Sequence, residues 1–105
     1  MATIEIMETK LQELHYDLTK AREALDHRED NENASHARLV ALEKMYRASG
    51  EDESVGKALD KAYDEYDEAY QLKKTAEDIA EAIEEAIEKL TETIRALEIL
   101  EAMGL

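Results

Sequence analysis

Apolar side chains recur along the first half of the chain at alternating steps of three and four residues, the spacing that makes one face of a helix apolar. The thirteen positions in this phase, here called the first seam, are Ile4, Met7, Leu11, Leu14, Leu18, Ala21, Leu25, Arg28, Glu32, Ser35, Leu39, Leu42 and Tyr46. Three successive members, Arg28, Glu32 and Ser35, are polar. Because the phase survives this interruption, the pattern predicts one long or kinked helix with a hydrophilic middle.

A second seam with the same spacing runs through the other half of the chain. Its positions are Leu59, Ala62, Tyr66, Ala69, Lys73, Ala76, Ala80, Ile83, Ile87, Leu90, Ile94 and Leu97. A companion column beside it widens the apolar face and consists of Leu72, Ile79, Ala86, Thr93 and Leu100. A face of that width usually contacts more than one helix.

The strongest break in the pattern is the segment 49–54, where Gly50 suits the end of a helix and the acidic and serine residues after it suit the start of the next. We therefore expect one all-α domain, 1–105, folded as a long antiparallel helical hairpin. Its first arm would be 3–48, its turn 49–54 and its second arm 55–102. A hairpin of this size has little core of its own, so we expect two copies to pair into a four-helix bundle or coiled coil.

The segment 26–35 is the weakest part of the first arm, because Asp, Asn, Ser and His compete for backbone hydrogen bonds in helix interiors. No Gly or Pro interrupts it, which favours a continuous or kinked helix over a loop. A loop would give three helices, with Asn33 or Ser35 as the cap of the new one.

Composition narrows the class of protein. Hydrophobic residues make up 44% and charged residues 38% of the chain, without Pro, Trp, Phe or Cys, which is typical of coiled coils and long helices. The formal net charge of -14 repels nucleic acid and anionic lipid and favours a protein partner with a basic surface. No apolar run approaches the ~20 residues of a membrane span, and the N-terminus does not resemble a signal peptide, so we expect a cytoplasmic protein.

The polar middle of the hairpin has two interpretations. Antiparallel pairing places Arg28, Glu32 and Ser35 roughly opposite Tyr66, Tyr70 and Lys73. One interpretation is a ligand site for an anion or small polar molecule, formed by Arg28, Glu32, Tyr66, Tyr70 and Lys73. The other, which we favour, is an ion pair of Glu32 with Arg28 or Lys73 that sets the register of the helices.

His27 and His36 each follow a glutamate by one helical turn, a spacing that can bind a metal ion. The Glu-x-x-His pattern of carboxylate-bridged di-metal bundles is absent, since Gln12, Ala24 and Asn33 precede the three histidines by three positions. We therefore predict no metal site and no cofactor.

Two surfaces of the second arm are candidates for binding a partner. Tyr63 and Tyr70 lie one step off the second seam, where an exposed tyrosine can be a recognition contact, although either ring could simply flank the helix interface. Acidic residues three or four positions apart form a row on the outer faces, in which we single out Glu81, Glu84, Glu85 and Glu88. Neighbours at this spacing lie ~5–6 Å apart, so the row either imitates a nucleic-acid backbone or is merely solvated.

No catalytic constellation and no glycine-rich phosphate loop is present, and no catalytic residue is nominated. The sequence predicts a non-enzymatic, acidic helical interaction protein that self-associates and binds a protein partner. One alternative is a small acidic inhibitor that mimics nucleic acid and blocks a nucleic-acid-binding enzyme. A second alternative is a small-ligand binder at the polar middle.

Overall fold

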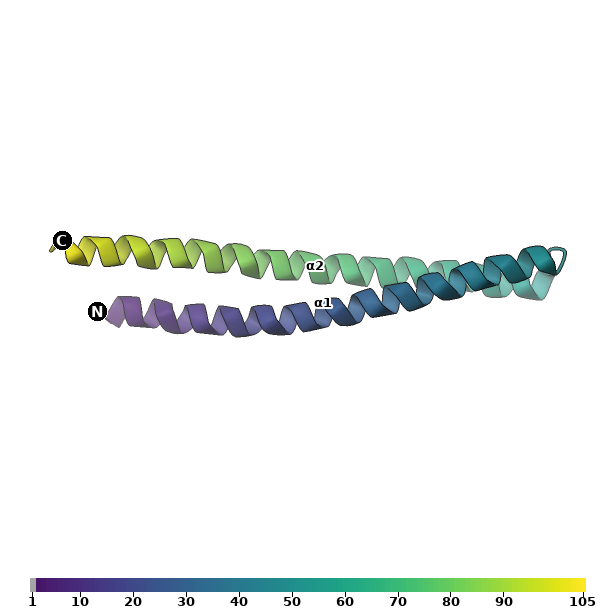
Figure 1. Cartoon of the computed structure of the whole chain (residues 1–105), viewed down its shortest axis with the longest axis horizontal. Coiled ribbons are helices and arrows are strands. Elements are labelled where there is room, and N and C mark those ends of the chain that lie inside the picture. Colours follow the sequence, from purple (N-terminus) through teal and green to yellow (C-terminus); the bar gives the residue numbers. More distant parts are fainter. Residues whose placement is uncertain (1) are drawn as a thin grey trace. The chain divides into compact units, whose positions relative to one another are not determined.

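The computed structural model describes residues 2–105 and consists of two helices, α1 (Ala2–Ala48) and α2 (Glu53–Ala102), joined by a short turn (Figure 1). No strand occurs in this range. The expected all-α helical hairpin is confirmed. In the same range, no helix has the length and apolar character needed to cross a bilayer.

Helix α1 is unbroken through the polar segment 26–35. The helical alternative is therefore confirmed, and the loop with a cap at Asn33 or Ser35 is wrong. The weak helix formers are tolerated because the seam on either side of them supplies apolar contacts that outweigh local propensity.

The residues pack in two units, each containing a segment of both helices. We call residues 2–23 with 78–105 the terminal unit, and residues 24–77, which include the turn, the turn unit. Within the terminal unit the buried apolar residues are Ile4, Leu18, Ala80 and Ile94. Within the turn unit they are Leu39, Ala62, Ala69 and Ala76.

Every position of the two predicted seams is buried or half-buried, including the polar members Arg28, Glu32, Ser35 and Lys73. The companion column is different, because Leu72, Ile79 and Leu100 remain exposed to 40%, 52% and 43%. The hairpin thus buries its seams and leaves the widened part of the α2 face in solvent.

The turn begins with a Schellman motif at the end of α1. The amide of Gly50 donates to the carbonyl of Arg47 at 3.3 Å, and that of Glu51 donates to the carbonyl of Tyr46 at 3.0 Å. Gly50 adopts a φ of 70°, a conformation that suits glycine. Glu51 adopts a φ of 67°, which is uncommon for a residue with a side chain.

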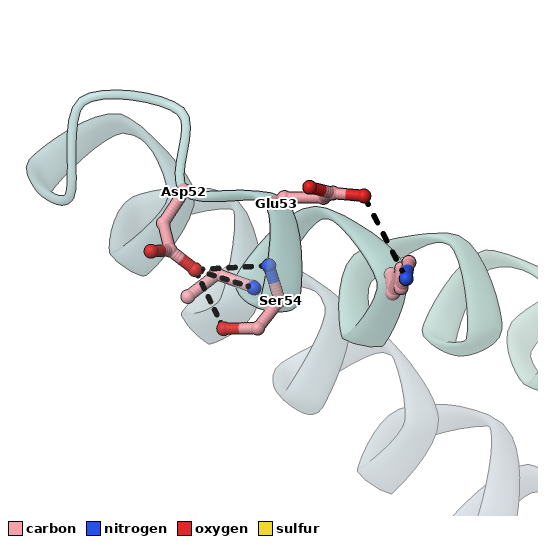
Figure 2. A network of polar contacts seen from close by, with 5 residues as sticks. Asp52, Glu53 and Ser54 are labelled. Atoms are coloured by element: carbon pink, nitrogen blue, oxygen red, sulfur yellow. Dashed lines mark hydrogen bonds and ion pairs between the residues drawn. The ribbon is translucent and has the colours of Figure 1, made fainter.

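Helix α2 starts at Glu53, two residues before the expected start, because Asp52 caps it. Oδ1 of Asp52 accepts the amides of Ser54 at 2.9 Å and Val55 at 3.2 Å, and also the hydroxyl of Ser54 at 2.5 Å (Figure 2). The Ser54 hydroxyl, followed by the two amides, lowers the pKa of the Asp52 carboxyl from its ordinary value.

We expect Asp52→Ala to lower the melting temperature by a few degrees at neutral pH, since it leaves helix amides without an acceptor. A carboxyl with a lowered pKa stabilises the fold above its unfolded pKa and loses this effect as the pH falls through the folded pKa. The melting temperatures of wild type and variant, followed by circular dichroism, should therefore converge in acid. Asp52→Asn is the control, because it retains a capping oxygen that does not titrate. A gap that is unchanged at pH 2 would contradict the assignment.

Candidate functional site

The polar middle of the turn unit contains a direct ion pair between the two helices. Nζ of Lys73 lies 2.5 Å from Oε2 of Glu32, and the two side chains are only 20% and 14% exposed. The same ammonium lies 5.3 Å from the ring centroid of Tyr70, in a cation–π contact. The ion pair considered for this layer is thus present, with Lys73 rather than Arg28 as the cation.

In this pair the Lys73 ammonium and the Glu32 carboxylate neutralise each other. The hydrogen bond to Glu32 raises the pKa of the Lys73 amine above its ordinary value, against a smaller opposing effect of desolvation. An ammonium already bound to a carboxylate has a lower affinity for an external anion, because the anion would have to displace Glu32. The geometry therefore favours the register-setting interpretation of Glu32 and Lys73.

The other two residues proposed for the ligand site, Arg28 and Tyr66, make no hydrogen bond or ion pair with Glu32 or Lys73. The ring of Tyr66 packs against His36, with centroids 5.5 Å apart. Arg28 makes no ion pair within residues 2–105 and lines an open hollow of about 310 Å³. The lining of the hollow is Arg28, Asn31, Ala34, Ser35, Glu65, Glu68, Ala69 and Leu72. Two glutamates in this lining make it a poor site for an anion.

Tyr63 and Tyr70 are exposed to 44% and 43%, in agreement with their positions one step off the second seam. The hydroxyl of Tyr63 donates a hydrogen bond of 2.6 Å to Oε1 of Glu43 on α1. This bond to a carboxylate raises the pKa of the Tyr63 phenol, because it stabilises the protonated form. The hydroxyl of Tyr63 is therefore held by α1, while 44% of the residue remains exposed. Its role in binding a partner stays a prediction.

The predicted acidic row, Glu81, Glu84, Glu85 and Glu88, lies in the terminal unit with all four side chains exposed. Glu84 accepts a hydrogen bond of 3.0 Å from Nη2 of Arg22 on α1. The other three make no hydrogen bond or ion pair with residues 2–105. Three of the four carboxylates are thus available to a partner.

Three cross-helix pairs were missed at the sequence level: Arg22 with Glu84, Arg38 with Glu65 at 2.9 Å, and Tyr63 with Glu43. In each pair, both residues lie one position after a seam residue or both lie one position before it. Counting outward from the turn would have found them, because antiparallel helices bring together residues at similar distances from the turn. All three are solvent-exposed, so they refine the register more than they stabilise the fold.

Within residues 2–105, no three His, Cys, Asp or Glu side chains are arranged to hold a metal ion. No protein-family model, curated protein or solved structure matches this chain. A proposal about function must therefore rest on the surfaces described above.

Proposed function

We propose that this chain is a non-enzymatic helical interaction protein that self-associates and binds a protein partner with a basic surface. The observation that carries the proposal is the small core of the hairpin beside large apolar side chains in solvent. Among residues 2–105, four of the eight buried apolar residues are alanine: Ala62, Ala69, Ala76 and Ala80. An alanine buries far less apolar area than a leucine, so these positions contribute little hydrophobic free energy.

The exposed apolar residues are larger and lie mainly on α2. Seven of them lie on α2 or directly after its end: Tyr63, Tyr70, Leu72, Ile79, Ile99, Leu100 and Met103. Single exposed apolar residues are common, but a column at heptad spacing marks a surface that packs against another helix. Self-association would cover the companion column and supply the apolar burial that the hairpin lacks.

The partner-binding part of the proposal rests on charge. The net charge is -14, and Glu81, Glu85 and Glu88 make no ion pair within residues 2–105. A basic protein surface would gain both electrostatic steering and charge-assisted hydrogen bonds from this row. Tyr63 and Tyr70 would add aromatic contacts to a partner at the turn unit.

Self-association is tested by sedimentation equilibrium of the full chain between about 1 and 100 µM, at which a dimer or higher oligomer is expected. A monomer over this whole range would overturn the proposal. High salt should leave the oligomer intact or strengthen it, because salt screens the repulsion between acidic chains.

The acidic inhibitor is the second candidate, favoured by the same three unpaired carboxylates. Neutralising Glu81, Glu84, Glu85 and Glu88 to Gln should then abolish inhibition of a nucleic-acid-binding enzyme and spare the fold, since all four side chains are exposed. The matched control changes Glu8, Glu13, Glu23 and Glu29 on α1, which are also exposed, to Gln. Inhibition that survives the first set would exclude mimicry by this row.

A further inference from the structure

A stripe within the terminal unit, which runs along α2 to Met103 just after the end of the helix, has the pattern of a third seam. Its members follow one another at alternating steps of four and three residues, the spacing of a helix–helix contact. We call this set the outer stripe, and it consists of Ile79, Ala82, Ala86, Lys89, Thr93, Ala96, Leu100 and Met103. Ala86 is half-buried and the others are exposed, with Met103 at 65%. The stripe shares Ile79, Ala86, Thr93 and Leu100 with the companion column and adds a second row beside them.

Carboxylates are excluded from the outer stripe, although this part of α2 is strongly acidic. The acidic residues of 78–105 all lie at other positions: Asp78, Glu81, Glu84, Glu85, Glu88, Glu92, Glu98 and Glu101. The hydroxyl of Thr93 donates to the carbonyl of Lys89 at 3.0 Å, which satisfies its polar group inside the helix. The stripe is therefore an uncharged apolar face except for Lys89.

We propose that the outer stripe binds the outer stripe of a second copy of this chain, with the two α2 helices antiparallel about a two-fold axis near Ala86 and Lys89. This inference rests on the proposed self-association and names its surface. Between Ile79 and Ala96 the stripe is complementary to itself in this arrangement. Ile79 of each copy lies opposite the small Ala96 of the other, and Ala82 lies opposite Thr93, so large side chains meet small ones.

Charge also favours a second copy as the occupant. Lys89 is the one charged member of the stripe and makes no ion pair within residues 2–105. Near the axis, each Lys89 faces the part of α2 around Ala86 in the other copy. Glu85 borders the stripe at this point. The chain thus offers its own carboxylate to its own unpaired ammonium, while Glu81 and Glu88 point away from the contact.

The first test compares two equivalent substitutions in sedimentation equilibrium. Ile79→Glu puts a carboxylate into the stripe twice per dimer, and we expect the dissociation constant to rise by about 100-fold or more. Ile6→Glu is the matched control, because Ile6 is 69% exposed, against 52% for Ile79, and lies on α1 of the same unit instead of on the stripe. Both variants should keep the helical circular dichroism of the wild type. Equal dissociation constants for the two variants would overturn the proposal.

The second test uses the absence of cysteine from the chain. Ala86→Cys lies within about one turn of the axis and should form a disulfide-linked dimer under mild oxidation. Glu88→Cys is equally close to the axis along the helix but on another face, and Ala96→Cys would lie ~26 Å from its symmetry mate. Neither control should cross-link efficiently.

The outcomes separate this proposal from the proposed function. An oligomer that cross-links through Glu88→Cys and not through Ala86→Cys would retain self-association and overturn the stripe as its surface. Cross-linking of both Ala86→Cys and Ala96→Cys would indicate parallel helices and overturn the antiparallel arrangement. A wild-type chain that stays monomeric would overturn self-association itself.

Discussion

Replacing Lys73 alone by leucine is expected to lower the melting temperature by several degrees, whereas replacing Glu32 and Lys73 together by leucine is expected to raise it. The single variant leaves the Glu32 carboxylate, which is 14% exposed in the wild type, without its cation. Removing one partner of a desolvated ion pair costs more than the pair itself contributes. The double variant removes both charges and continues the apolar seam of each helix through the turn unit.

The measurement is thermal unfolding of wild type, Glu32→Leu, Lys73→Leu and the double variant as a double-mutant cycle at one protein concentration. The matched control is the pair of Arg38 and Glu65 in the same unit, whose side chains are 56% and 35% exposed. Removing either of those charges should change the melting temperature little. A double variant less stable than both single variants would contradict the argument.

The pH dependence of the same cycle gives a second readout. Because the pKa of Lys73 is raised by Glu32, the pair contributes fully below the ordinary lysine pKa and loses its contribution as the pH rises through the folded pKa. The double variant should lose less stability than the wild type between neutral and strongly alkaline pH. A changed oligomer mass in the double variant would further support a role of the polar layer in setting register.

Much of the hairpin could be predicted because heptad spacing depends on sequence alone. All thirteen positions of the first seam and all twelve of the second are buried or half-buried, and Gly50 follows the end of α1 as expected. The expected start of α2 was two residues late. The reason is that an N-cap residue lies outside the helix and its side chain accepts amides two and three positions on, so Asp52 permits helix from Glu53.

The candidate sites were less predictable, since they depend on which groups meet across the hairpin. The sequence offered Arg28 and Lys73 as equal partners for Glu32, and only the register between the helices selects Lys73. The cross-helix bond from Tyr63 to Glu43 likewise needs the rotation of both helices about their axes. Whether a partner covers the acidic row is a property of a second molecule, on which one chain carries no direct information.

Leu39→Ala is expected to lower the free energy of unfolding by about 2–4 kcal/mol, because it removes a large buried side chain. Leu39 is 6% exposed, and the other buried apolar residues of the turn unit are Ala62, Ala69 and Ala76. Since the other buried apolar residues of the unit are alanines, few buried atoms could relax into the space left behind.

Chemical denaturation followed by circular dichroism measures this loss, at a fixed concentration because self-association contributes to apparent stability. Met45→Ala is the matched control, since Met45 is a large apolar residue of α1 in the same unit but is 55% exposed. It should cost much less, because truncating it removes little buried area and leaves no cavity. Equal losses for the two variants would mean that Met45 is buried in the oligomer, and would extend the self-association surface from α2 to α1. A small loss for both would instead show that packing at the first seam contributes less to the turn unit than the burial of Leu39 implies.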